Sequence, residues 1–222
     1  MLESEKFEPL FPWEKKLRFK IKRHLEGAPF DHDWSHALRT RNYALQISKK
    51  EKVDLEIIVA ASLLHDTGHT EESHQNHMVL SMRLAERWLE EVDFPSQKIP
   101  QVLEAIEFHD EMWWPSPQDF PSNNKELLIL EDADKLDALG AIGLARTLIF
   151  ISRHWSSWPS SDSRPTKASQ KEKHFQMIQH IKKLLKIKDR MNTEEGKRLA
   201  LAKHKFIKDF LKRFYLEWQG KG

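Results

Sequence analysis

One segment of this chain, residues 55–66 (LEIIVAASLLHD), is apolar on most sides and ends in a histidine and an aspartate. An α-helix of this kind has little polar surface to present to water, so other elements must surround it. Asp54 in front of the segment is a suitable N-cap, and Gly68 behind it is a suitable stop. The segment therefore predicts a buried central helix with two ionisable side chains, His65 and Asp66, at its C-terminal end.

The rest of the sequence is also helical in pattern. Glycine is scarce, at 7 of 222 residues, and the Asn-Gly and Asp-Gly turns of β-hairpins are missing. We therefore predict an all-α fold, a single domain that spans residues 1–222. Further helices are expected at about 12–26, 33–50, 76–91, 100–109, 125–151, 170–188 and 194–218.

Three parts are expected within this domain. A helical core covers about residues 30–151, and C-terminal helices cover about 170–218. Between them, residues 152–169 are rich in serine and proline, which indicates a linker or a mobile lid. Two of the expected loops carry pairs of tryptophans, either to stack over a ligand or to pack the loops against the helices. These tryptophans are Trp113, Trp114, Trp155 and Trp158.

Composition excludes several classes of protein. No apolar run is long enough for a membrane span and the N-terminus lacks a signal-peptide pattern, so a cytoplasmic protein is expected. The absence of cysteine excludes disulfides and thiolate metal sites. The net charge of +2 gives no support for dedicated nucleic-acid binding. With twelve histidines available, any transition metal must be held by imidazoles and carboxylates.

The placement of four residues predicts such a site. His65 and Asp66 end the most apolar helix, where ionisable groups are costly unless they are paired or bound to a metal. His36 lies on a core-facing stripe of its helix, and Asp134 lies on an otherwise apolar face of another. Two imidazoles and two carboxylates could thus surround one divalent ion. This donor set suits Mn, Co, Ni, Fe or Zn, and admits Mg.

The pattern of His36, His65-Asp66 and Asp134 resembles the HD-domain phosphohydrolases. The likeness extends to HDWSHALRTRNYAL, AASLLHDTGH, NHMVLSMRLAERWL, AIEFHD, EDADKLDALGAIGLAR and MNTEEGKRLA, from about Phe30 to Trp218. It implies a helical HD-domain bundle and metal-dependent hydrolysis of phosphate esters or anhydrides. The substrate class that we expect is a small phosphorylated metabolite, with nucleoside triphosphates or monophosphates favoured.

The resemblance also suggests roles for individual residues. Asp66 is expected to bind the metal and to orient or deprotonate the attacking water. His69 lies where other HD subfamilies often have an acidic catalytic residue, so it is a candidate acid or base. His32 and Asp33 match the family as well, but capping of the next helix explains them well enough.

Four more residues are candidates for substrate binding. Lys135 and Arg39 are the cations best placed to meet phosphate oxygens. His77 and His109 match family positions, where they would contact phosphate, support the ligands by hydrogen bonds, or hold a second ion bridged by Asp66.

Two other functions stay open at this point. Some HD-type folds hold a di-iron centre and perform oxygenation, which requires two metal ions. A non-catalytic binding module could instead keep the metal as a structural support, with a closed coordination sphere. The sequence does not specify the oligomeric state.

Overall fold

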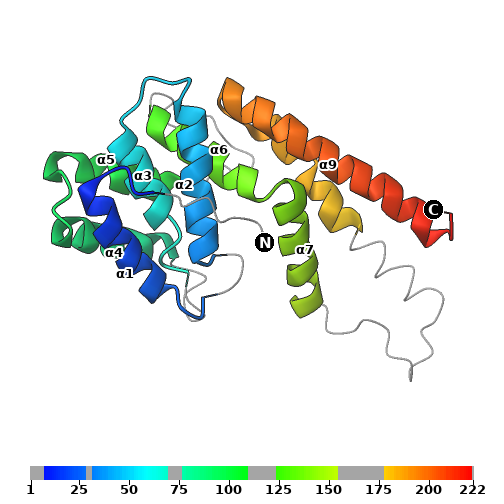
Figure 1. Ribbon diagram of the computed structural model, residues 1–222, viewed down its shortest axis with the longest axis horizontal. Coiled ribbons are helices and arrows are strands. Elements are labelled where there is room, and N and C mark those ends of the chain that lie inside the picture. Colours follow the sequence, from blue (N-terminus) through cyan, green and yellow to red (C-terminus); the bar gives the residue numbers. More distant parts are fainter. Residues whose placement is uncertain (1–7, 29–31, 70–76, 110–123, 155–177, 222) are drawn as a thin grey trace. The chain divides into compact units, whose positions relative to one another are not determined.

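The computed structural model describes residues 8–28, 32–69, 77–109, 124–154 and 178–221. Every regular element in these ranges is a helix, and none of their residues is in a strand (Figure 1). The all-α prediction is therefore confirmed. Among the helices of these ranges, none is both long and apolar enough to cross a bilayer.

The chain forms two compact units, Met1–Glu131 and Asp132–Gly222. The boundary falls inside one helix, α6 (Lys125–Asp137). The prediction of a single domain stays a prediction, and each unit is described here by itself.

The first unit is built around one central helix. Its elements before α6 are α1 (Pro12–His24), α2 (Trp34–Ser48), α3 (Leu55–Leu64), α4 (His77–Glu91), η1 (Ser96–Lys98) and α5 (Ile99–Phe108). Helix α3 contacts α1, α2, α4 and α5, and lies among them in Figure 1. Its residues from Ile57 to Leu64 are all buried. The predicted buried central helix is thus confirmed.

Capping side chains set where the site-bearing helices begin. Asp33 caps α2, because its carboxylate accepts a hydrogen bond from the His36 backbone N–H at 2.9 Å. Asp54 caps α3 in the same way, accepting from the backbone N–H groups of Glu56 and Ile57. Each cap satisfies donors that a helix start leaves open. The caps therefore fix the register in which His36 and the end of α3 face the core.

The second unit corrects one prediction. Residues 125–151 do not form one long helix, but α6 and then α7 (Gly140–His154). Gly140 adopts a φ of +72°, in the left-handed region, so a right-handed helix cannot continue through it. Gly143 allows a close backbone approach, because a Cβ there would collide with the carbonyl oxygen of Ala138.

The rest of the second unit packs against a long C-terminal helix. Residues 178–184 are helical and lead into η3 (Ile187–Arg190). Helix α9 (Glu194–Trp218) contacts α7 and η3, and its predicted range is confirmed. Most of the predicted linker or lid at 152–169 lies outside the described residues, as do the four tryptophans of the two predicted loops.

Candidate metal centre

Imidazoles from several elements of the first unit surround one buried carboxylate. Asp66 lies in the turn after α3 and is 7% exposed. Histidine nitrogens lie between 2.7 and 3.6 Å from its two oxygens. They belong to His32, His36, His65, His69 and His109. Three of the four predicted ligands, His36, His65 and Asp66, are thus brought together.

These three ligands present their donor atoms as a nearly equilateral triangle. The Nε2 atoms of His36 and His65 are 3.2 Å apart, and each lies 3.3 Å from Oδ2 of Asp66. Donors held about 2.1 Å from a divalent ion at tetrahedral or octahedral angles are separated by roughly 3.0–3.4 Å. The observed spacing is therefore that of one face of a coordination sphere.

The outer hydrogen bonds of two histidines set their tautomers. Nδ1–H of His65 donates to the Ser62 carbonyl at 3.0 Å, and Nδ1–H of His109 donates to the Ile106 carbonyl at 2.6 Å. A carbonyl can only accept, so in each neutral ring Nε2 carries a lone pair. Each of these Nε2 atoms lies 3.3 Å from an Asp66 oxygen. An imidazole nitrogen and a carboxylate oxygen this close need a proton or a metal ion between them, and a ring whose Nδ1–H is already held by a carbonyl is the usual form of a metal-binding histidine.

The electrostatics keep the central carboxylate charged. Burial alone would raise the pKa of Asp66, but the neighbouring imidazoles of His65 and His32 hold that pKa well below its usual value. Burial also lowers the pKa of His69 to about 3, with Asp66 opposing the shift. At neutral pH the centre therefore contains an ionised acceptor and a neutral His69.

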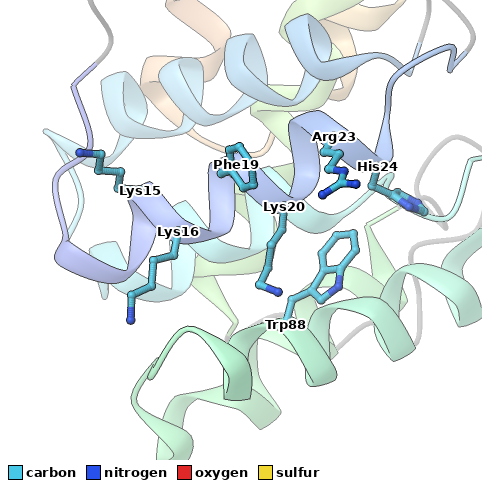
Figure 2. Close-up of a pocket in the computed structure, with 7 residues that line it drawn as sticks. All are labelled: Lys15, Lys16, Phe19, Lys20, Arg23, His24 and Trp88. Carbon is cyan, nitrogen blue, oxygen red and sulfur yellow. The ribbon is translucent and has the colours of Figure 1, made fainter.

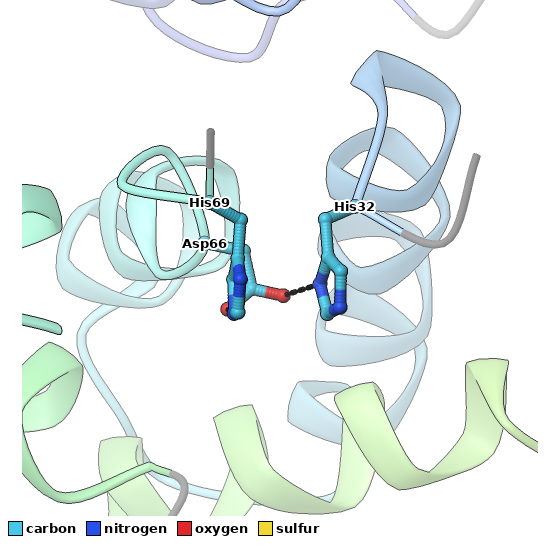
Figure 3. A group of neighbouring side chains, drawn as sticks. All are labelled: His32, Asp66 and His69. Carbon is cyan, nitrogen blue, oxygen red and sulfur yellow. Dashed lines mark hydrogen bonds and ion pairs between the residues drawn. The ribbon is translucent and has the colours of Figure 1, made fainter. Parts of the chain in front are cut away.

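The turn after α3 is fastened to α4. The backbone N–H of Gly68 donates to the Ser81 hydroxyl at 2.8 Å, and a Cβ on Gly68 would collide with the backbone carbonyl of His77. Only glycine permits this approach. It brings His69 against His77, with ring centroids 3.9 Å apart, while the other face of His69 stacks on His32 at 3.8 Å. Figure 3 shows His32 and His69 side by side next to Asp66.

The remaining predicted residues lie on α2 and α6. Arg39 is half-buried on α2, one turn beyond His36. Asp134 and Lys135 belong to the part of α6 that falls in the second unit. Asp134 is half-buried, whereas Lys135 is 1% exposed and its Nζ donates to the Arg190 carbonyl at 3.4 Å. The roles assigned to these three residues stay predictions.

One member of the cluster was not predicted. His32 was explained by helix capping alone, yet its Nδ1 lies 2.7 Å from Oδ2 of Asp66. A signal was present in the sequence, because His32 stands four residues before His36 and directly before the capping Asp33. A side chain just outside a helix start can lie over the first turn, which here carries His36.

A groove between α1 and α4 offers different chemistry (Figure 2). It is lined by Lys15, Lys16, Phe19, Lys20, Arg23, His24 and Trp88. Lys16 and Lys20 form ion pairs with Asp93 and Glu91. With no carboxylate and one imidazole in its lining, the groove does not supply a metal-ligand set. One hydrogen bond joins the groove to the turn that carries Asp66. Nε2–H of His24 donates to the carbonyl of Thr67, the residue after Asp66, at 2.9 Å.

Comparison with known proteins agrees with the fold. The family model for the HD domain matches residues 33–139. The structure of an HD-superfamily hydrolase from Bacillus thuringiensis is 30% identical, with a TM-score of 0.67, over 94% of this chain and 97% of that chain. The chain therefore belongs to the HD-domain superfamily.

The Bacillus subtilis protein YpgQ is a further relative. It is 27% identical over 209 residues, which make up 90% of each chain. The crystal structure of YpgQ in complex with ADP has a TM-score of 0.66 and 25% identity, and covers 92% of this chain and 94% of that one. ADP is thus a ligand of a protein that is similar to this chain along nearly its whole length.

Proposed function

We propose that this protein is a metal-dependent phosphohydrolase that acts on a small phosphorylated metabolite, with nucleotides as the favoured class. The observation that carries the proposal is the triangle of His36 Nε2, His65 Nε2 and Asp66 Oδ2, with edges of 3.2–3.3 Å. Its mixed nitrogen and oxygen donors suit Mn, Co, Ni, Fe or Zn, and admit Mg. Membership of the HD superfamily and the hydrolase relative support the reaction class.

Asp134 is our candidate for the fourth protein ligand. It follows Leu130 by four residues and Leu127 by seven along α6, so helical geometry places the three side chains on one face. Leu127 and Leu130 belong to the hydrophobic core of the first unit. A carboxylate that continues this apolar face is costly without a counter-charge, which an ion held by His36, His65 and Asp66 would supply.

Several side chains of this protein would each have a role in hydrolysis of the phosphate bond. A bound divalent ion would lower the pKa of a coordinated water and polarise a phosphoryl oxygen. Asp66 would orient that water, and His69, at 3.6 Å from Asp66 Oδ1, would exchange a proton with the reacting groups. Lys135 and Arg39 would neutralise the phosphate oxygens.

The nucleotide preference rests on the relative that binds ADP, YpgQ. A nucleotide supplies both the phosphoryl group that a metal polarises and an anionic chain for Lys135 and Arg39 to hold. The proposal therefore predicts release of phosphate or pyrophosphate from at least one nucleotide.

The test is a screen of nucleotides and sugar phosphates with protein loaded with Mn²⁺ or Co²⁺. Phosphate or pyrophosphate release is measured for wild type, Asp66→Ala and Asp134→Ala. Both variants should lose about 10³-fold or more, because each removes a metal ligand. Asp209→Ala, at an exposed aspartate on α9, is the matched control and should keep wild-type activity. Equal activity in wild type and Asp66→Ala would refute the mechanism.

One contact favours a second ion. Nε2 of His109, with its lone pair set by Ile106, lies 3.3 Å from Oδ1 of Asp66, the oxygen that does not belong to the first triangle. A second ion held by His109, His77 and Oδ1 would make Asp66 a bridging ligand between two ions. Two-metal phosphohydrolases and di-iron oxygenases both require such a ligand. Metal analysis of the purified protein decides this point: a single ion per chain excludes the di-iron alternative and leaves His77 and His109 as substrate contacts.

A further inference from the structure

His32 is the member of the cluster whose contact with Asp66 is shortest. Its Nδ1 lies 2.7 Å from Oδ2, whereas the nitrogens of the ligand triangle lie 3.3 Å from the same oxygen. A separation of 2.7 Å is that of a charge-assisted N–H···O⁻ hydrogen bond. It is shorter than the spacing of two donors around one ion. His32 and the triangle therefore use Oδ2 in different ways.

A carboxylate oxygen has two lone-pair directions, and here each has its own use. Oδ2 accepts a hydrogen bond from Nδ1–H of His32 at 2.7 Å, and the Nε2 atoms of His36 and His65 lie 3.3 Å from the same oxygen, so a second lone pair is left for an ion that these two rings would hold. Without the first contact, the carboxylate of Asp66 could rotate and exchange Oδ2 for Oδ1. Such outer hydrogen bonds orient ligands, and their loss commonly weakens metal binding 10- to 100-fold.

The backbone and the ring plane of His32 are both restrained. Its neighbour Asp33 caps α2 through the His36 N–H and accepts the first helical bond from Ala37 N–H at 3.2 Å. The ring stacks on His69 with an interplanar angle of 16°, and meets the ring of His36 edge-on. The His32 ring therefore has a defined direction towards Asp66, which a merely solvated histidine would not have.

We propose that His32 is a positioning residue for the metal centre: its Nδ1–H holds the Asp66 carboxylate so that Oδ2 faces the ion. The proposal deepens the proposed function, on which it rests, and assigns to His32 more than the capping that its position in the sequence suggests. His32 does not itself bind the ion. It acts through Asp66, and its contribution is to metal affinity.

The test compares three substitutions that differ in where they place an N–H group. His32→Asn puts an amide N–H near the position of Nδ1, His32→Gln puts one near Nε2, and His32→Ala has none. Mn²⁺ affinity is measured by titration calorimetry on metal-free protein. His32→Ala and His32→Gln should raise Kd by about 10- to 100-fold, while His32→Asn should stay within about threefold of wild type. His204→Ala, a histidine of α9 outside the cluster, is the control.

The three variants also separate positioning from the other roles. Equal losses in all three would make the ring itself a ligand and overturn the proposal, and so would wild-type affinity in His32→Ala. The thermal midpoint of each metal-free variant shows whether it is folded, so that only folded variants are compared.

A second measurement does not depend on metal binding. Nitrogen-15 NMR of metal-free protein should show the His32 ring protonated at Nδ1 in wild type and shifted towards protonation at Nε2 in Asp66→Ala. An Nδ1-protonated ring in both proteins would overturn the proposal. If wild type binds no Mn²⁺ and yet shows this shift, the proposed function fails while the His32–Asp66 bond stands.

Discussion

Two buried aspartates, one in each unit, show how a structural carboxylate differs from a functional one. Asp132 is fully buried, and three donors satisfy it: the backbone N–H groups of Asn192 and Thr193, at 2.7 and 2.8 Å, and the Thr193 hydroxyl at 2.7 Å. Asp66 is buried too, but it is surrounded by imidazole nitrogens, two of which belong to rings whose Nδ1–H is held by a carbonyl. Asp132 is satisfied by permanent donors within the protein, whereas the imidazoles around Asp66 form with it a group that could hold a metal ion.

The difference lies in the type of partner rather than in burial. Backbone N–H groups and hydroxyls are permanent donors, so they hold a carboxylate without a further group. Imidazoles can donate or accept, and those fixed as acceptors by outer carbonyls form a ligand set. A buried acid surrounded by several imidazoles, some with Nδ1 held by a carbonyl, is thus the pattern that distinguishes a candidate metal centre from a structural hydrogen-bond network.

The largest expected effect on stability is at the structural carboxylate. Asp132→Ala leaves three donors of the half-buried Asn192 and Thr193 without their acceptor and should lower the free energy of unfolding by about 3 kcal/mol. Urea denaturation of the metal-free protein measures the loss. The Mn²⁺ affinity of the folded variant should stay within about threefold of wild type, because Asp132 is satisfied without a metal.

Asp66→Ala is the opposite case. It should abolish Mn²⁺ binding in calorimetry, whatever its effect on urea denaturation. If Asp132→Ala instead lost metal binding with little change in stability, the contrast between the two carboxylates would be wrong.

The sequence was sufficient for the fold class and for the proximity of His65 and Asp66 to one buried cluster, and the reason is physical. The apolar segment 55–66 requires burial on all sides. His65 and Asp66 at its end are therefore buried too, which is costly in free energy unless these ionisable groups have partners. The break between α6 and α7 was missed because glycine is compatible with a helix interior, and only its φ of +72° shows that Gly140 ends one. His32 was missed because its bond to Asp66 joins residues 34 apart in the chain.

Metal addition should again distinguish Asp66 from Asp132, with a somewhat smaller change in the free energy of unfolding. A ligand that binds only the folded state stabilises it by RT ln(1 + [L]/Kd), or about 2.7 kcal/mol at a hundredfold excess over Kd. Mn²⁺ should therefore raise the free energy of unfolding by about this amount in wild type, and a chelator should reverse the rise. The same increment should appear in Asp132→Asn and vanish in Asp66→Ala. An increment that survives in Asp66→Ala would place the bound ion elsewhere.

The smallest expected effect is the pH dependence of stability that Asp132 contributes. Burial raises the pKa of Asp132 above 3.8, against the opposing effect of its hydrogen-bond donors. The folded state then holds the proton more tightly than the unfolded state, so the stabilisation is present below 3.8 and is lost as pH rises through the folded pKa. The stability of wild type relative to Asp132→Asn should therefore fall as pH rises above 3.8, which urea denaturation at a series of pH values measures.

Asp54 provides an internal reference with the opposite sign. Its burial favours a raised pKa, but hydrogen bonds from Lys98 and from the start of α3 outweigh burial and lower it. The stability that Asp54 contributes is thus present above 3.8 and lost as pH falls through the folded pKa. Wild type should gain stability relative to Asp54→Asn as pH rises towards 3.8, and should lose stability relative to Asp132→Asn as pH rises above 3.8. If its stability relative to Asp132→Asn instead rose with pH below 3.8, the hydrogen-bond donors around Asp132 would outweigh its burial.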